Sequence, residues 1–219
     1  VGELLAHRAG FDGQDDVTSR PFAAYLQDHT ARDTAFDVQL RWAIARRLPL
    51  QPGSQYAYSN AAYLMLGAII EETTGQPYEA FCRQAVLTPL GARDAALDPA
   101  WRILASYGGW RMPLADYGRF YQAYAVGNPA IGPVARQWMM HPPFAGTDRT
   151  VVHYGLGTFV RLTPEGGGRF WHWGRWTYKT RTSFDGPLDI SYSTFAVRLG
   201  ALDVNMIVYV EPGLQRGSG

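Results

Sequence analysis

The sequence predicts an α+β fold, with a mainly helical region over residues 1–150 and an antiparallel sheet over 151–219 of the same domain. Apolar residues recur at helical spacing through the first part of the chain, which indicates amphipathic helices. The last third holds short β-branched and aromatic runs separated by Gly, Pro and Asp, which is typical of hairpin-linked strands. With 219 residues, 47% hydrophobic and 18% charged, the chain can bury one substantial core.

The expected helices are delimited by capping residues, prolines and glycines. Ser19 can cap the first, and Gly75 is a left-handed stop for the third. The helices begin near Ser19, span 36–47, run from Ser59 or Asn60 to Gly75, run from Pro77 to Thr88, and run from Leu114 to Ala125. The residues expected to face a core are Phe36, Leu40, Ala43 and Ile44 in the second helix, and Leu64, Met65, Ala68 and Ile69 in the third.

The expected strands cover 153–162, 169–173, 193–199 and 204–210, with a hairpin turn over 163–168. The last run, Met206–Val210, is not polar on either face. An antiparallel sheet tolerates one bare face only when that face is polar. We therefore expect the fold to be incomplete at its termini, with further chain belonging at one or both ends.

Charge and cysteine content exclude several functions. The formal net charge of +1 gives no electrostatic argument for binding nucleic acid or a membrane surface. No apolar stretch approaches the about 18 residues that a bilayer span requires. Cys82 is the only cysteine, and His29, His141 and His153 lack metal-ligand spacing, so we expect no metal site and no cofactor.

Tyr58-Ser59-Asn60, which lies between a Pro-Gly turn and an apolar helix, is the main candidate for chemistry. A phenol and a carboxamide two residues apart at a helix entrance can point the same way, one carrying a proton and the other holding a substrate carbonyl. His172-Trp173-Gly174 is the second candidate, and together they suggest serine acyl transfer. Taken alone, Tyr58 and Asn60 also fit an ordinary turn and N-cap.

The segment from Leu50 to Gly67 resembles the corresponding segment of the serine β-lactamase and penicillin-binding-protein-like family. It is most similar to the branch that holds class C β-lactamases, D-aminopeptidases and related esterases. Further landmarks of the family follow in order along nearly the whole chain: Leu4-Leu5-Ala6-His7 to Gly10, Pro89-Leu90-Gly91, Gly108-Gly109 followed by Asp116, Tyr154-Gly155-Leu156-Gly157, and His172-Trp173-Gly174.

This resemblance implies an all-helical part and an antiparallel sheet flanked by helices, with the active site in the cleft between them. It also implies a nucleophilic Ser-x-x-Lys upstream of Leu4, and the sequence contains none, because its only lysine, Lys179, follows Trp176 at that spacing. Either an N-terminal segment of the protein lies outside this sequence or the nucleophile has been lost. We favour the first reading, and the resemblance slightly favours a periplasmic or secreted location.

The resemblance also assigns roles to residues. Tyr58 would be the base, since a phenol with an ordinary pKa near 10 can accept a proton if a nearby cation stabilises its phenolate. The missing lysine would supply that cation, and a protonated His172 would add to it. Asn60 would bind substrate, the backbone N–H of Arg175 would stabilise the oxyanion, and Gly174 would let substrate approach the strand.

His172 and Trp173 replace the Lys-Thr pair that holds the β-lactam carboxylate in many β-lactamases. Neither replacement reproduces an ammonium or a hydroxyl, so the expected substrates are small-molecule esters, amides or peptides rather than β-lactams. The aromatic run over 170–176 is consistent with an apolar acyl or aryl pocket.

Other readings remain open on the sequence alone. The protein could be an inactive relative that binds a ligand, or a carbohydrate-binding domain that uses Trp171, Trp173 and Trp176 as a stacking platform. His172 could be a core histidine bonded to backbone. His7 is expected to be structural, fixing the turn at Gly10.

Overall fold

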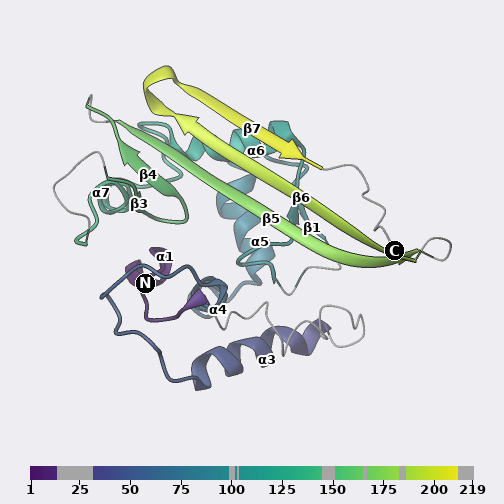
Figure 1. Ribbon diagram of the computed structural model, residues 1–219. Coiled ribbons are helices and arrows are strands. Elements are labelled where there is room, and N and C mark those ends of the chain that lie inside the picture. Colours follow the sequence, from purple (N-terminus) through teal and green to yellow (C-terminus); the bar gives the residue numbers. More distant parts are fainter. Residues whose placement is uncertain are drawn as a thin grey trace.

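The computed structural model describes residues 1–13, 32–98, 102, 104–144, 151–164, 167–182 and 186–211. A five-stranded antiparallel sheet crosses the molecule, with α6 behind it and α1, α3 and α4 below it in the view of Figure 1. The helix expected to begin at Ser19 lies outside the described residues.

The sheet is a meander in which each strand pairs with its neighbours in sequence, in the order β3-β4-β5-β6-β7. The strands are β3 (His153–Tyr154), β4 (Phe159–Leu162), β5 (Gly168–Thr182), β6 (Gly186–Leu199) and β7 (Val204–Val210). The predicted bounds of β7 are confirmed. The predicted strand over 153–162 is divided, because the N–H of Gly155 donates to the carbonyl of Thr158 and closes a turn.

β5 and β6 contain 15 and 14 residues, far more than the runs predicted from hydrophobic pattern. The pattern fails because the outer half of β5 is mostly polar and the outer half of β6 begins with Gly186 and Pro187, which weakens the strand signal. Each strand is held instead by a continuous register with the other, from Arg169 opposite Leu199 to Thr182 opposite Gly186.

The main core lies against one face of the sheet. Phe170 and Ala196 are buried there, and Tyr124 stacks on Phe170 with ring centroids 5.3 Å apart. The covering elements are α6 (Leu114–Tyr121), η4 (Gln122–Tyr124) and α7 (Pro133–Met140). The predicted helix over 114–125 is therefore confirmed with a 3₁₀ last turn, whereas α7, which begins at Pro133, was missed.

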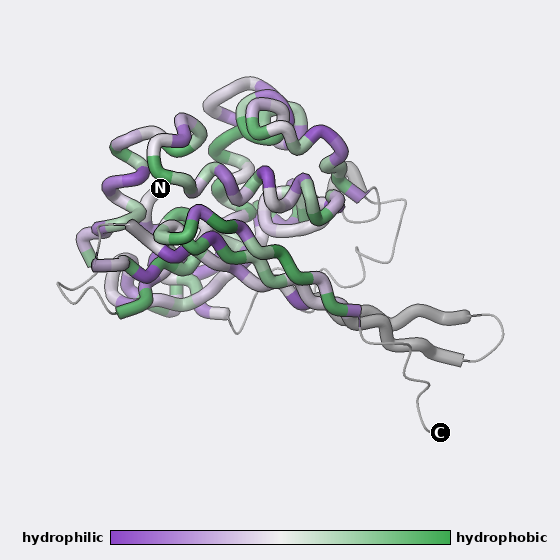
Figure 2. The backbone as a smooth tube through the Cα atoms, turned by 90° about the horizontal axis from the view of Figure 1, so that it is seen from above, coloured by the Kyte–Doolittle hydropathy of each residue, from purple (hydrophilic) through white to green (hydrophobic). Residues whose placement is uncertain are grey.

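The opposite face of the sheet is apolar and exposed. Along the strands the register places on that face a row of side chains that are 38 to 53% exposed: Trp173, Val204, Met206, Val208 and Val210. Figure 2 shows hydrophobic residues alternating with polar ones along these strands. Sheets that leave one face to water usually make it polar, so this face departs from the ordinary amphipathic pattern, as the last run of the sequence predicted.

The remaining elements come before the sheet. They are α1 (Gly2–Leu5), α3 (Arg32–Ala45), α4 (Asn60–Thr74), α5 (Tyr78–Cys82), the π-helix η2 (Arg83–Leu87), the two-stranded pair β1 (Ala96–Leu97) and β2 (Trp110–Arg111), and the late 3₁₀ turn η5 (Gly200–Leu202). The helix predicted from Pro77 to Thr88 is present as α5 and η2, with its second half wound as a π-helix.

α3 shows a different buried face from the predicted one. Ala43 is buried against Ala61 and Leu64 of α4, as expected, but Ile44 is 63% exposed. Gln39 takes a core position, where its side-chain oxygen accepts a hydrogen bond from the Tyr107 hydroxyl at 2.8 Å. The prediction for Ile44 was wrong because apolar spacing cannot anticipate a buried amide that has a distant partner.

α4 has clear signals at both ends. Ser59 is its N-cap, with Oγ accepting from the N–H of Ala61 at 3.1 Å, and Gly75 ends it in the left-handed conformation at φ +66°. Both ends were predicted. In between, Gly67 passes so close to Ser106 that an added Cβ would lie 2.6 Å from its Cβ, so this packing requires a glycine.

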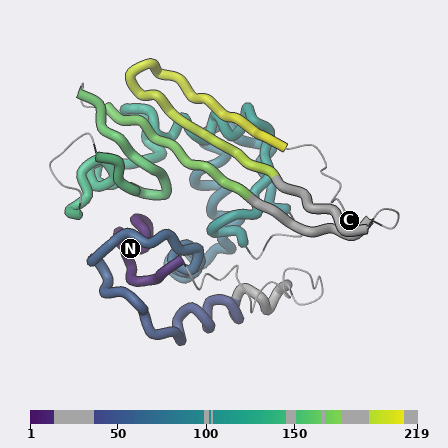
Figure 3. Tube along the Cα trace, viewed as in Figure 1, coloured from purple at the N-terminus to yellow at the C-terminus, as the bar shows by residue number. Residues whose placement is uncertain are grey.

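Residues 1–13 and 48–60 lie side by side, although they are distant in sequence (Figure 3). Peptide N–H groups of Leu50, Gly53 and Ala57 donate to carbonyls of the first segment at 3.1, 2.8 and 2.8 Å. The Arg8 guanidinium adds bonds to the carbonyls of Gly53 and Ser54, both at 3.1 Å. The chain that leads into α4 is thus fixed by the N-terminal segment.

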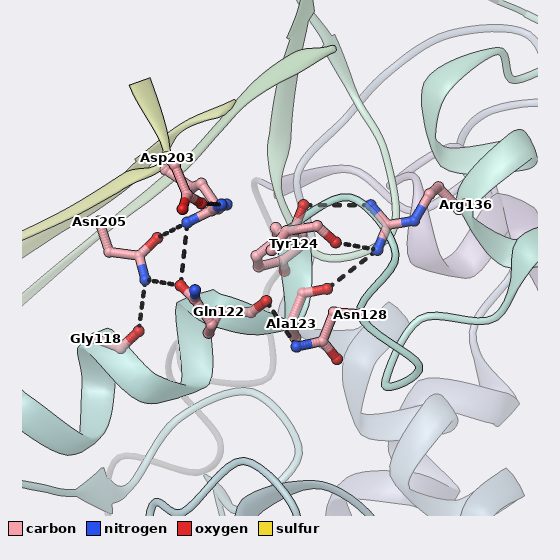
Figure 4. Close-up of polar contacts among 10 residues, drawn as sticks. Gly118, Gln122, Ala123, Tyr124, Asn128, Arg136, Asp203 and Asn205 are labelled. Carbon is pink, nitrogen blue, oxygen red and sulfur yellow. Dashed lines mark hydrogen bonds and ion pairs between the residues drawn. The ribbon is translucent and has the colours of Figure 1, made fainter. Parts of the chain in front are cut away.

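Arg198 connects the helical cover to the sheet, and Arg136 joins α7 to the end of η4 within that cover (Figure 4). Arg198 of β6 is 2% exposed, donates to Gln122 Oε1 at 3.1 Å and Asn205 Oδ1 at 2.9 Å, and pairs with Asp203. Asn205 continues the network, with its Nδ2 donating to the carbonyl of Gly118 at 2.9 Å. A buried guanidinium with these partners sets the position of α6 on β6 and β7.

Arg136 of α7 donates to the carbonyls of Ala123, Tyr124 and Ala125, at 3.2, 3.2 and 2.9 Å. The Ala125 carbonyl also accepts from the N–H of Asn128 at 3.1 Å, so removal of the guanidinium affects mainly the carbonyls of Ala123 and Tyr124, which end η4. We expect Arg136→Ala to lower the free energy of unfolding by roughly 2–4 kcal/mol in urea denaturation. Arg93→Ala, at an exposed position, is the matched control, and equal losses in the two variants would contradict this role.

Candidate active site

Tyr58, Ser59 and Asn60 form the entrance to α4. Ser59 is buried and Asn60, the first helical residue, is half-buried, whereas Tyr58 is 40% exposed. The N-cap lies at the open end of the helix, and Tyr58 and Asn60 flank it in the sequence.

At this entrance, His7 accepts hydrogen bonds from the backbone on both sides of Tyr58. Its carbonyl accepts from the N–H of Ala57 at 2.8 Å, and its Nδ1 accepts from the N–H of Ser59 at 3.1 Å. The residue is 2% exposed and has φ +54°, a left-handed conformation that is uncommon for a residue other than glycine. The sequence suggested that His7 fixes the turn at Gly10, but its imidazole bonds to Ser59.

A cluster of aromatic rings surrounds this imidazole. The centroid of His7 lies 4.1 Å from Tyr58, 4.9 Å from Tyr63 and 4.6 Å from Tyr154. Tyr154 in turn lies 6.1 Å from His172 and 6.4 Å from Tyr58. Tyr58 and His172, 114 positions apart, are thus brought to the same cluster by Tyr154. Tyr63 and Tyr154 were not predicted as site residues, although Tyr154 belongs to one of the motifs.

The buried phenols of the cluster are neutral. The Tyr63 hydroxyl donates to the carbonyl of Leu5 at 2.8 Å, and burial raises the pKa of both Tyr63 and Tyr154 well above the ordinary value. Tyr58 and Tyr56, 40% and 42% exposed, are the cluster phenols that reach the surface. Tyr58 is therefore well placed to meet a bound substrate.

The two imidazoles are also neutral near pH 7. Burial, together with the charge that His172 would carry, lowers the pKa of His7 to about 3. Burial lowers the pKa of His172 as well, although a hydrogen bond with the backbone of Trp173 opposes this shift. A positive charge on His172, which the sequence left open, is disfavoured by this burial.

β5 has an open edge beside this cluster. β4 begins at Phe159 opposite Trp171, and among the described residues no strand pairs with β5 on that side from His172 onwards. The Trp171 carbonyl faces β4, where it accepts from Thr158 Oγ1 at 3.0 Å. Because backbone direction repeats every second residue, the backbone groups of Trp173 and Arg175 face the open edge.

Side chains on this edge alternate between the two faces of the sheet. His172 lies on the same face as Gly174, and an added Cβ at Gly174 would lie 3.3 Å from Thr194 Oγ1. Trp173 lies on the exposed face, where it stacks on Phe159 at 4.7 Å and an interplanar angle of 9°. Arg175 has an exposed side chain.

The described serines of the helical part have hydroxyls that are otherwise engaged or buried. Ser59 Oγ caps α4, and Ser54 Oγ donates to the carbonyl of Gln51 at 2.6 Å. Ser106 is packed against Gly67. Ser59 meets His7 through its N–H and not its hydroxyl, so the pair is not a serine–histidine dyad.

Over the described ranges, no group of three or more His, Cys, Asp or Glu side chains is arranged to hold a metal ion. None of the helices described is long and apolar enough to cross a membrane.

An exposed phenol and a carboxamide lie at the entrance of α4, and the open edge of β5 lies near the same aromatic cluster. The family model described as Beta-lactamase matches residues 1–195, and the chain belongs to that family. The family comprises serine hydrolases, among them D-amino acid amidases and carboxypeptidases. The predicted family and fold class are confirmed.

Relatives of this chain carry the name D-alanyl-D-alanine carboxypeptidase. One from Escherichia coli strain K12 is 30% identical over 101 residues, which is 45% of this chain and 22% of that protein. One from Salmonella newport is 28% identical over 99 residues, 44% of this chain and 21% of that protein. The matched part thus spans about a fifth of the length of these relatives.

Solved structures share the fold at low identity. A D-stereospecific amidohydrolase from Streptomyces sp. has a TM-score of 0.66 at 19% identity, covering 94% of this chain and 65% of that chain. The octameric penicillin-binding protein homologue from Pyrococcus abyssi has a TM-score of 0.65 at 18% identity, covering 96% and 51%.

The buried state of His7 predicts a loss of stability in acid. Its pKa is about 3 in the folded protein against 6.5 for an ordinary imidazole, so the unfolded state binds a proton first as the pH falls. The free energy of unfolding should therefore fall below about pH 6.5, by up to about 1.4 kcal/mol per pH unit for this group.

We expect His7→Gln to reduce the difference between the unfolding free energies at about pH 7 and about pH 5, both measured by urea denaturation. His141→Gln, at an exposed histidine, is the control and should keep the slope of the wild type. Equal slopes in the wild type and His7→Gln would show that His7 does not titrate as a buried neutral group.

Proposed function

We propose that the protein is a serine hydrolase that cleaves esters or small amides through an acyl-enzyme, with its nucleophile in a Ser-x-x-Lys segment outside this sequence. The observation that carries the proposal is the placement of Tyr58, an exposed phenol held at the entrance of α4 and sharing an aromatic cluster with His172. Membership of the Beta-lactamase family supports it, as does the engagement or burial of the hydroxyls of Ser54, Ser59 and Ser106.

In the proposed reaction, Tyr58 as phenolate takes the proton of the serine hydroxyl while the serine oxygen attacks the substrate carbonyl. The C–O bond to serine forms, and the carbonyl electrons move onto oxygen. Tyr58 then returns the proton to the leaving alcohol or amine as its bond to the acyl carbon breaks. Water repeats the sequence on the acyl-enzyme, releasing the acid and restoring the serine.

The chain would contribute two further groups. The N–H of Arg175 faces the open edge of β5, where it can donate to the oxyanion together with the N–H of the nucleophile. Asn60 can hold the substrate carbonyl or the catalytic lysine. Because His172 is neutral, the positive charge that favours the Tyr58 phenolate would come from that lysine.

The names of relatives and structural neighbours bear on the substrate. These names refer to D-configured substrates, as in the D-stereospecific amidohydrolase and the D-amino acid amidase from Ochrobactrum anthropi SV3. In this chain, a neutral His172 and Trp173 occupy the place of a Lys-Thr pair. We propose small esters or D-amino-acid amides as substrates and β-lactams as poor ones.

Tyr58→Phe tests the base directly. It removes only the hydroxyl of an exposed ring, so we expect the full-length enzyme to fold normally while kcat for p-nitrophenyl acetate falls by roughly 10²–10⁴-fold. Tyr56→Phe is the matched control, since Tyr56 is equally exposed and contacts the same cluster. Unchanged turnover in Tyr58→Phe would remove it from the mechanism, and an inactive wild type would favour a ligand-binding relative.

Substrate preference tests the role of His172 and Trp173. A charge-assisted hydrogen bond contributes about 1.5–3 kcal/mol, so losing one lowers kcat/KM by roughly one to two decades. We expect higher kcat/KM for short p-nitrophenyl esters than for nitrocefin, and a narrower gap in the double variant His172→Lys, Trp173→Thr. A wild type that prefers nitrocefin to every ester would contradict this substrate class and point to another carboxylate site.

A further inference from the structure

We propose that His7 is a positioning residue for Tyr58, whose imidazole sets the orientation of the phenol used in catalysis. The proposal rests on the proposed function, because it assigns His7 to the orientation of the base. From the sequence alone, His7 was expected only to fix the turn at Gly10. Four observations on the imidazole, its backbone and its ring contacts support the wider role.

The first is that His7 binds the peptide groups on both sides of Tyr58. The N–H of Ala57 donates to its carbonyl at 2.8 Å, and the N–H of Ser59 donates to its Nδ1 at 3.1 Å. These bonds restrict the backbone dihedrals of Tyr58 from either end. The Tyr58 side chain leaves the backbone between the two bonds, so its direction follows from them.

The second is ring contact. The imidazole lies 4.1 Å from the Tyr58 ring at an interplanar angle of 37°, the shortest ring separation among the contacts of His7. Tyr63 and Tyr154 pack against the imidazole and hold it in place. One face of the Tyr58 ring therefore rests on a side chain that is itself fixed, which limits the rotamers of the phenol.

The third is the chemical state of the ring. Nδ1 accepts a hydrogen bond, so the proton of the neutral imidazole is on Nε2. Burial keeps the ring neutral. Protonation of Nδ1 would also replace this acceptor with a second donor facing the Ser59 N–H. Of the side chains common in proteins, few others offer both a flat ring and an acceptor at this distance from the backbone.

The fourth is cost. His7 adopts φ +54°, which favours glycine or asparagine, and its buried Nε2 has no hydrogen-bond partner within the described residues. If this position served only the turn, a residue without the strained backbone and the unpaired polar atom would suffice. The imidazole bonds to Ser59, 52 positions along the chain, and this bond is specific to the entrance of α4.

Two variants in the full-length enzyme separate the contributions. His7→Leu removes the acceptor at similar volume, while the side-chain oxygen of His7→Gln can still accept from the Ser59 N–H. We expect His7→Leu to lower kcat for p-nitrophenyl acetate by roughly 10–100-fold, with KM changed less than about threefold, because a small displacement of a catalytic group has effects of this size. His7→Gln should recover most of the lost kcat.

Nuclear magnetic resonance supplies readouts that do not depend on activity. In the wild type, the nitrogen spectrum of His7 should show the neutral tautomer with the proton on Nε2. The ring signals of Tyr58, assigned with Tyr58→Phe, should shift or broaden in His7→Leu, while those of Tyr192 on the sheet stay unchanged. If His7→Leu does not fold, the tautomer and His7→Gln still decide the question.

A proton on Nδ1 would overturn the proposal. So would a His7→Leu enzyme that keeps wild-type kcat while Tyr58→Phe is inactive, which would leave the proposed function intact. If Tyr58→Phe is fully active, the proposed role of Tyr58 as base fails. The Tyr58 ring signals alone then test the positioning, and unchanged signals in His7→Leu would overturn it. If kcat falls equally in His7→Gln and His7→Leu, and the loss in each variant equals its fraction of unfolded enzyme, His7 has only a structural role and the proposal is wrong.

Discussion

The hydrogen bonds that the peptide N–H groups on either side of Tyr58 donate to His7 join the N-terminal segment to the entrance of α4. The position of the helix end, the direction of the phenol and the aromatic cluster around the imidazole all depend on this contact. The bond of Tyr63 to the Leu5 carbonyl reinforces it one helical turn further on. A short segment before the first long helix thereby fixes residues that lie some 50 positions later.

The sheet meets this assembly through Tyr154, which packs against His7 on one side and His172 on the other. The sheet is in turn joined to its helical cover by Arg198, while Arg136 donates to the carbonyls that end η4 within that cover. Burial has a chemical consequence at the site. It keeps both imidazoles neutral, so the described part of the cluster supplies donors, acceptors and apolar surface but little charge.

Much of the fold was predictable because its signals are local. Ser59 and Gly75 delimit α4, and alternating apolar residues mark β7 with its observed bounds. The failures have physical causes. α7 was not predicted from its N-terminal proline because the helix is short. β5 and β6 extend further than predicted because they are held by pairing with each other and not by hydrophobic pattern. In α3, Gln39 is buried with a distant partner, and the predicted core residue Ile44 is exposed. For the candidate site, the sequence indicated Tyr58, Asn60 and His172, and it did not indicate Tyr63, Tyr154 or the imidazole contacts of His7.

The sequence by itself determined the fold class, the family and the residue types at the candidate site, because caps, turns, periodicity and short motifs each depend on a few neighbouring residues. The tertiary structure decided which of those residues meet, which face of the sheet is covered, and which groups lose contact with water. Hydrogen bonds such as the one between His7 and Ser59 join positions far apart in the chain. The burial that sets the protonation of His7 and His172 arises only when those distant segments pack together.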